Sequence, residues 1–165
     1  VDFLVSRLFA QHDKSQLHYE ALAEEEVCAI ARRGHPIFQI KRPGLRDLAA
    51  HGWIVPPVGS VLRHRFELMF QSAGLEPPRQ VIGTAALVFL TKMLQQGDYL
   101  AVVPTDVARH YAEFGMVEVV PVELSCRMDS FGIITRSDWL LSPGATNVLQ
   151  AIKQAANEVY GLSPA

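Results

Sequence analysis

The stretch that decides the fold is residues 53–115, WIVPPVGSVLRHRFELMFQSAGLEPPRQVIGTAALVFLTKMLQQGDYLAVVPTDVARHYAEFG. It repeats one pattern three times: a short apolar run, a small or hydroxyl residue, an amphipathic segment and a glycine. Each repeat is typical of a buried strand, a turn and a covering helix, so the stretch predicts α/β packing around a parallel sheet. Ser60, Thr84 and Thr105 follow the three apolar runs. Because ligands collect at the carboxyl ends of parallel strands, where helix N-termini present unpaired N–H groups, these three residues are the first binding candidates.

Two long extended segments, Glu25–Arg33 and Cys126–Arg136, bracket this compact unit. The apolar strand VDFLV at the start and the helix after Ser142 are then expected to belong together in a second lobe. Two lobes joined by two crossing strands form a cleft that a hinge can open. The predicted division is residues 1–28 for part of lobe one, 29–126 for lobe two, and 127–165 for the crossing strand and the C-terminal helix of lobe one.

The amphipathic segments differ in their apolar surface. The first carries a stripe that is expected to face the sheet or a partner, with Leu68 outside it; the stripe residues are Leu62, Phe66, Met69 and Phe70. The second, from Ala85 to Gln95, has more apolar residues than one face can hold. We therefore expect that helix to be buried on two sides.

Composition excludes several classes of protein. The chain has 165 residues, 49% of them hydrophobic, and a net charge of −2, so it has no global positive field to hold a nucleic acid. No apolar run is long enough for a membrane helix, and nothing at the start resembles a signal peptide. The chain begins directly in an apolar run without methionine, which we interpret as a fragment of a longer protein.

The two cysteines leave one alternative open. Cys28 and Cys126 each lie in an apolar alternating run. They could form a redox pair, but thiols packed as small hydrophobic side chains are the commoner case in a cytosolic chain.

The order and spacing of five segments resemble the effector-binding domain of LysR-type transcriptional regulators over essentially all 165 residues. The segments are VDFLVSRL, EEEVCAIARRGHPI, LRDLAAHGWIVPPVGSVLRHRFELMFQSAGLEPPR, QQGDYLAVVPTDVARHYAEFG and RSDWLLSPGATNVL. Within that family the chain is more narrowly similar to sugar-responsive and protocatechuate-pathway regulators. The resemblance implies a periplasmic-binding-protein type II fold of two α/β lobes with lobe one incomplete here. It also implies a cytoplasmic homodimer or tetramer that binds a small-molecule effector, without a cofactor, and contacts DNA only through an absent winged helix-turn-helix domain.

The candidate effector site combines these two lines of reasoning. On lobe two it comprises the three hydroxyl residues and their neighbours Gly59, Val61 and Pro104; together the residues are Gly59, Ser60, Val61, Thr84, Pro104 and Thr105. Ser60 is also expected to be a plain helix N-cap. Ser6 and Arg7 are the candidates on lobe one, and Arg7 could clamp a carboxylate or simply be solvated. Phe131 could line the cleft floor, although sheet packing is the commoner role.

Other functions have less support in the sequence. The sequence around Ser60 is VGSV and lacks the second glycine of a GxSxG nucleophile elbow, and the six histidines show no metal-binding spacing. The favoured hypothesis is a non-enzymatic effector sensor for a small anionic or polyhydroxylated metabolite. A solute-binding protein of a transport system is the main alternative, and a small α/β enzyme is the third.

Overall fold

The computed structural model describes residues 2–7, 16–138 and 140–161. The chain divides into two compact units. Unit 1 comprises Val1–Glu25 and Asp129–Ala165, and unit 2 comprises Glu26–Met128. Two strands, β2 (Leu17–Ala31) and β7 (Arg127–Arg136), run from one unit into the other.

Unit 1 consists of β1 (Phe3–Ser6), the first part of β2, most of β7 and helix α5 (Pro143–Tyr160). β1 pairs antiparallel with β7, and β7 lies beside β2. The core of this unit is a small apolar cluster; its buried members are Leu22, Ile133, Leu149 and Ala156. As expected, α5 begins with a serine cap followed by proline, since Ser142 accepts a hydrogen bond from the Ala145 N–H at 3.2 Å.

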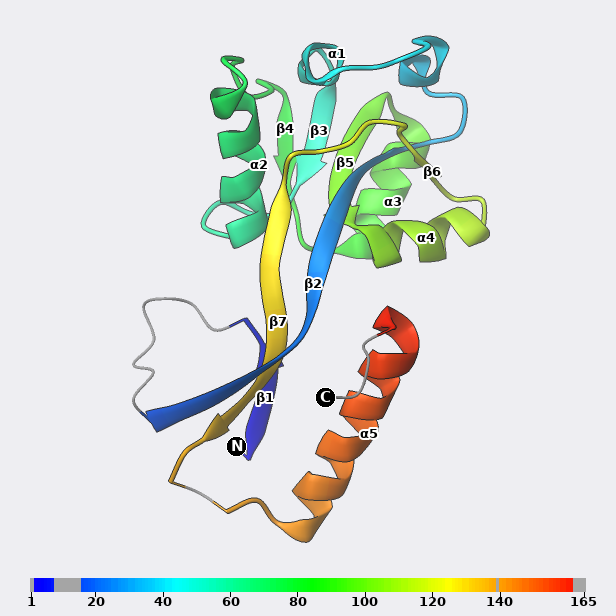
Figure 1. Cartoon of the computed structure of the whole chain (residues 1–165). Coiled ribbons are helices and arrows are strands. Elements are labelled where there is room, and N and C mark those ends of the chain that lie inside the picture. Colours follow the sequence, from blue (N-terminus) through cyan, green and yellow to red (C-terminus); the bar gives the residue numbers. More distant parts are fainter. Residues whose placement is uncertain (1, 8–15, 139, 162–165) are drawn as a thin grey trace. The chain divides into compact units, whose positions relative to one another are not determined.

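Unit 2 holds the strand and helix repeats (Figure 1). Its strands besides β2 are β3 (Gly52–Val55), β4 (Val81–Gly83), β5 (Tyr99–Pro104) and β6 (Glu118–Val119). Its helices are the short 3-10 helix η2 (Pro36–Gln39), α1 (Leu45–Ala49), α2 (Val61–Ser72), α3 (Leu87–Gln96) and α4 (Thr105–Glu113).

The sheet of unit 2 is mixed, so the expectation of a parallel sheet is wrong for the sheet as a whole. β3 pairs in parallel with both β4 and β5, as the three repeats predict. β2, however, runs antiparallel to β5, with Val27 opposite Pro104, and antiparallel to β6. The reason is that β2 belongs to no strand–helix repeat and enters this sheet from the other unit.

Helices cover both faces of this sheet (Figure 1). Alternation along β3 sends Trp53 and Val55 into the cluster beneath α1 and α2, while Ile54 packs in the cluster beneath α3 and α4. The Trp53 ring is fully buried, lies 4.7 Å from the ring of Phe66, and donates its indole N–H to the Leu48 carbonyl at 2.9 Å. Burying aromatic side chains of this kind contributes about 1.5–3 kcal/mol each.

Two expectations about helix surfaces have different outcomes. In α2, Phe66, Met69 and Phe70 are buried, and Leu68 is 43% exposed, as its place off the stripe predicts. The prediction that α3 is buried on two sides is wrong, because Val88 is 73% exposed and its neighbours in the first turn are also exposed. α3 packs on the sheet through its buried residues, which are Leu90, Thr91 and Leu94. Among the described residues, nothing covers the opposite side of its first turn.

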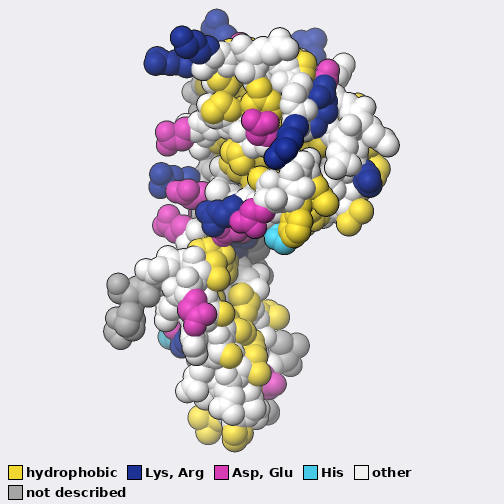
Figure 2. All heavy atoms as spheres, turned by 90° about the vertical axis from the view of Figure 1, so that its right-hand side faces the viewer, with side chains coloured by type: hydrophobic (Ala, Val, Ile, Leu, Met, Phe, Trp, Pro, Cys, Tyr) yellow, Lys and Arg dark blue, Asp and Glu magenta, His cyan; other side chains and the backbone are white. Residues whose placement is uncertain are grey.

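Charged side chains are mixed over the surface shown in Figure 2. On the described part of that face, Lys and Arg side chains are interspersed with Asp and Glu side chains, and apolar side chains reach the surface between them. This distribution agrees with the net charge of −2 and with the absence of a global positive field.

Candidate functional site

The carboxyl ends of the three parallel strands of unit 2 lie side by side, and we call this end of the sheet the sheet edge. β3 lies between β5 and β4, with Ile54 opposite Ala101 and Val55 opposite Gly83. Thr84 follows β4 directly, and its N–H donates to the Val55 carbonyl at 2.9 Å. Thr105 follows β5 directly, and Ser60 comes after the turn that leaves β3. The fold of unit 2 therefore brings the three hydroxyl residues to the same sheet edge.

Ser60 caps α2, as expected. Its hydroxyl oxygen accepts from the Arg63 N–H at 3.3 Å and donates to the Pro57 carbonyl at 2.8 Å. Gly59 before it has a φ of +88°, a left-handed conformation that favours glycine, and there is open space where its side chain would be. A ligand atom can therefore approach the backbone at this turn, while Val61, the first residue of α2, is half-buried against the core.

Thr84 and Thr105 do not repeat the capping geometry of Ser60. Thr84 accepts from the Ala86 N–H at 3.1 Å, but the N-cap of α3 is Ala86, which has no side-chain cap. Thr105 is the first residue of α4, whose N-cap is Pro104 and also lacks a side-chain acceptor. The first turns of α3 and α4 consequently keep backbone N–H groups that water or a ligand can accept from.

A cavity of about 170 Å³ opens beside Thr105. It is lined by both cysteines, by Thr105 and by charged residues; these residues include Glu26, Cys28, Thr105, Cys126 and Arg127. Its volume is close to that of cavities that hold a single small ring.

Both cysteines are free; Cys126 is buried and Cys28 is half-buried. Burial raises the pKa of the Cys28 thiol, and the hydrogen bond with Thr105 offsets this rise only partly. Burial also raises the pKa of the Cys126 thiol, against the nearby positive charge of Arg65. Cys28 packs with the α3 and α4 side of the sheet and Cys126 with the α1 and α2 side. Thiols whose pKa is raised by burial are poor nucleophiles, which favours the packing role over a redox pair.

The candidates on unit 1 have partners of their own. The Arg7 guanidinium forms an ion pair with Glu25 at 2.5 Å and donates from Nε to the Asp129 carbonyl at 2.9 Å, so it is not simply solvated. Phe131 lies 5.7 Å from the ring of Tyr160 and packs on the unit 1 core, which agrees with sheet packing. Ser6 is exposed at the end of β1. A role for these three in effector binding stays a prediction.

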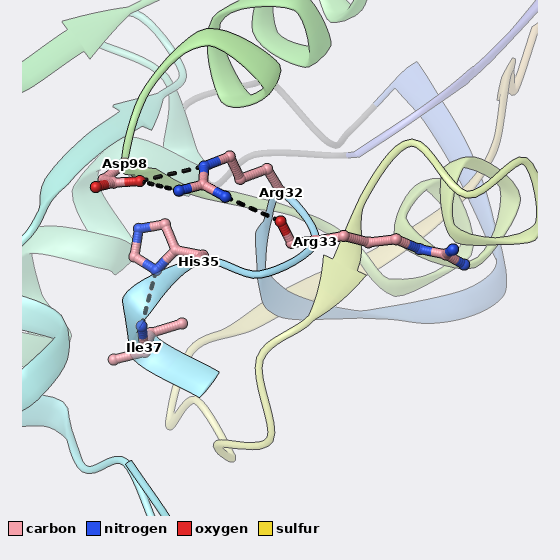
Figure 3. Close-up of polar contacts among 5 residues, drawn as sticks. All are labelled: Arg32, Arg33, His35, Ile37 and Asp98. Atoms are coloured by element: carbon pink, nitrogen blue, oxygen red, sulfur yellow. Dashed lines mark hydrogen bonds and ion pairs between the residues drawn. The ribbon is translucent and has the colours of Figure 1, made fainter. Parts of the chain in front are cut away.

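A buried histidine that sequence reasoning missed lies at the other end of the unit 2 sheet (Figure 3). His35 is 1% exposed, and its Nδ1 accepts from the Ile37 N–H at 3.0 Å, which caps η2. Its Nε2 makes no hydrogen bond of ordinary geometry among the described residues, although the Asp98 carbonyl lies close enough to influence the ring. Nearby, Arg32 forms an ion pair with Asp98 at 2.6 Å, and the ring of His51 lies 4.9 Å away.

The electrostatics around His35 favour its neutral imidazole. Burial is the main cause that lowers the pKa of His35, and the positive charges of His51 and Arg32 act in the same direction. The Asp98 carbonyl and carboxylate act against this shift without cancelling it. The Gly34-His35-Pro36 sequence predicts the end of a strand, but no sequence pattern shows that the ring is buried.

Metal-binding clusters and membrane-spanning helices are both absent from the described ranges. Within the described ranges, no cluster of three His, Cys, Asp or Glu side chains could hold a metal ion. Among the same residues, no helix combines the length and the apolar character that crossing a bilayer needs.

Comparison with known proteins identifies similar sequences. The family model described as LysR substrate binding domain matches residues 1–157. The HTH-type transcriptional regulator GbpR of Azospirillum brasilense is 34% identical over 158 residues, which cover 95% of this chain and 46% of that protein. GalR of Pseudomonas putida is 30% identical over 158 residues, which cover 96% of this chain and 40% of that protein. This chain therefore spans less than half the length of these two curated relatives.

Solved structures share the fold. The regulatory domain of CcmR from Synechocystis PCC6803, in complex with 2-PG, has a TM-score of 0.74 at 16% identity and covers 94% of this chain and 73% of that one. The BenM effector binding domain with its effector benzoate has a TM-score of 0.71 at 18% identity and covers 99% of this chain and 73% of that one. These likenesses confirm the expected periplasmic-binding-protein type II-like fold.

Proposed function

The chain belongs to the family of LysR substrate-binding domains, and from this membership we propose that it senses a small-molecule effector for a LysR-type transcriptional regulator. Its curated relatives GbpR, GalR and PcaQ are HTH-type transcriptional regulators and match the sugar and protocatechuate group expected from the sequence. Relatives that are regulators favour a sensor over a transport protein or an enzyme.

The proposed effector site lies at the sheet edge of unit 2. One observation carries it: parallel pairing of β3 with β4 and β5 places Ser60, Thr84 and Thr105 at one edge, next to helix N-termini. Hydroxyl groups and backbone N–H donors in that arrangement suit an oxygen-rich ligand, and the positive ends of the helix dipoles favour a negative charge on it. The effector is therefore proposed to be anionic or polyhydroxylated, which includes sugars, sugar acids and aromatic acids.

The signal is proposed to be a shift in population between two conformations of the regulator. An effector causes such a shift only through different affinity for the two conformations, so its contacts must change when the protein rearranges. DNA binding belongs to a helix-turn-helix domain outside this chain, the working form is a homodimer or tetramer, and the compartment is the cytoplasm. These three features of the whole protein are proposed because the chain belongs to the LysR family.

A thermal-shift screen of the full-length protein with monosaccharides, sugar acids and aromatic carboxylic acids tests the site. A true effector raises the melting temperature progressively with its concentration, as mass action requires. The Ser60→Ala, Thr84→Ala double variant is expected to lose this response and remain folded. It loses the α2 cap, which costs about 1 kcal/mol of stability.

The matched control is the double variant Ser142→Ala, Thr146→Ala on α5. Ser142 also caps a helix, and Thr146 also makes a local hydrogen bond, to the Ser142 carbonyl at 3.1 Å. The control therefore loses similar stability but should keep the ligand response. A full response in the Ser60, Thr84 variant would refute the site assignment.

A further inference from the structure

The segment that contains η2 and the start of α1 concentrates positive charge at one end of unit 2. Residues 32–46, RRGHPIFQIKRPGLR, contain five of the fifteen Lys and Arg residues of the chain and no Asp or Glu. The last three of the five, Lys41, Arg42 and Arg46, are exposed, and we call these three side chains the basic tip. Figure 1 draws η2 and α1 at the upper end of unit 2, and Figure 2 shows Lys and Arg side chains gathered at that end.

We propose that the basic tip is a docking surface for an acidic segment of a partner protein. The tip lies where α1 leads into the amino end of β3, whereas the sheet edge lies at the carboxyl ends of β3, β4 and β5. A partner at the tip would therefore leave the proposed effector site open. The proposal adds an interaction to the proposed function and does not depend on where the effector binds.

The charges of the basic tip are not used inside the protein. Within the described part of the chain, none of its three side chains forms an ion pair or a hydrogen bond, whereas Arg32 nearby pairs with Asp98 at 2.6 Å. The nearest carboxylate along the chain is that of Asp47, which is half-buried and accepts the Gly44 N–H at 2.8 Å. Three positive charges against this one carboxylate leave two in excess.

Buried residues on both sides of the loop hold the basic tip in place. Ile37 in η2 and Leu48 in α1 are fully buried in the core cluster of unit 2. Pro43, in the middle of the loop, is also buried. A loop that is fixed at its ends and its middle has little backbone freedom to lose when a partner binds, and this preorganisation favours binding.

Two observations favour an acidic protein segment over DNA. The chain has a net charge of −2, so it does not attract a long polyanion from a distance, whereas a short acidic segment responds to the local charge within a Debye length of about 10 Å. Ile40, next to Lys41, is 37% exposed and offers an apolar contact. Protein interfaces use such contacts, but a phosphate backbone does not. The matching partner is a run of Asp or Glu residues around an aliphatic side chain.

Fluorescence anisotropy of a fluorescein-labelled peptide with the sequence EEELEEE tests the proposal. Five extended residues reach about 18 Å, which bounds the distance from Lys41 to Arg46, so this peptide is long enough to span the basic tip. Binding to the chain should be saturable at low salt and at least about tenfold weaker at about 0.5 M salt. The labelled peptide QQQLQQQ should not bind measurably, and EEESEEE should bind about threefold more weakly because it lacks the apolar contact.

Two double variants separate the basic tip from the overall charge of the chain. Lys41→Glu with Arg42→Glu should weaken binding of EEELEEE at least about tenfold, because two attractions become two repulsions. Lys92→Glu with Arg109→Glu makes the same change in residue type and net charge on α3 and α4, and it should keep the affinity within about twofold because salt screens distant charges. All four side chains are exposed, so the fold should persist, which circular dichroism checks.

Three results would overturn the proposal. They are equal affinity for EEELEEE and QQQLQQQ, equal weakening by the two double variants, and tighter binding of a short DNA duplex than of EEELEEE at the same salt concentration, which would make the basic tip a DNA contact. The Ser60→Ala, Thr84→Ala variant should bind EEELEEE as the parent chain does. Failure of the sheet-edge assignment and failure of the basic tip are therefore distinguishable.

Discussion

Replacement of His35 by Asn should remove a pH dependence of stability while keeping the helix cap. The imidazole accepts the Ile37 N–H through Nδ1 and is buried, so a second proton would break this hydrogen bond and place a charge near Arg32 and His51. Asn offers an acceptor in the same role and does not titrate. His35→Ala removes the acceptor and should cost about 1 kcal/mol at any pH.

The magnitude follows from proton linkage. The ordinary pKa of histidine is near 6.5, and burial lowers the pKa of His35 in the folded chain. Its contribution to stability is therefore fully present above pH 6.5 and is lost as the pH falls, because the unfolded chain then binds a proton that the folded chain does not. The loss of unfolding free energy between about pH 7.5 and about pH 5.5 is at most about 1.4 kcal/mol, the value for a folded chain that keeps His35 fully neutral over this interval.

Urea denaturation at these two pH values provides the assay. Trp53 is buried in the core cluster of unit 2. If Trp139 is replaced by Phe in every protein compared, the fluorescence of Trp53 alone reports the unfolding of unit 2. The other five histidines are common to both proteins, so the difference between the parent and His35→Asn isolates His35. Equal losses of unfolding free energy in these two proteins would show that His35 does not titrate as argued.

Two further predictions concern packing. Gly132→Ala should destabilise the chain by about 1–3 kcal/mol, because its Cβ would lie 2.2 Å from the Glu20 carbonyl oxygen. Gly144→Ala, with open space around it, should be neutral or stabilise the chain by about 0.5–1 kcal/mol. Circular dichroism during urea unfolding tests both variants, and equal unfolding midpoints would contradict the close approach of β7 and β2. Trp53→Phe removes the hydrogen bond to the Leu48 carbonyl and should cost about 1–2 kcal/mol. An unchanged unfolding midpoint would show that this bond adds nothing.

Part of the candidate site could be predicted because it depends on local patterns. The glycine and serine at positions 59 and 60 form a turn and a cap that nearby residues determine, and the structure confirms both. The different roles of Thr84 and Thr105 could not be read in this way. Whether a hydroxyl caps its helix depends on the residue at which the helix begins, and α3 and α4 begin at different distances from their strands.

Contacts between residues that lie far apart in the sequence explain the other features of the site that the sequence did not predict. The ion pair of Arg7 with Glu25 and the contact of His35 with His51 join residues that no short pattern relates. The exposed first turn of α3 was missed for the opposite reason, since apolar residues are expected to be covered and no sequence pattern shows where a neighbouring element is absent.

The sequence by itself determined the repeated strand and helix units, the family and the position of hydroxyl residues after three strands, because hydrophobic period, caps and glycines act over a few residues. Only the tertiary structure decided that β2 joins the sheet antiparallel, that buried residues on both sides hold the basic tip, and that His35 is buried with one nitrogen that makes no hydrogen bond of ordinary geometry within the described part of the chain. These properties depend on which distant segments pack together, and burial and pKa follow from that packing.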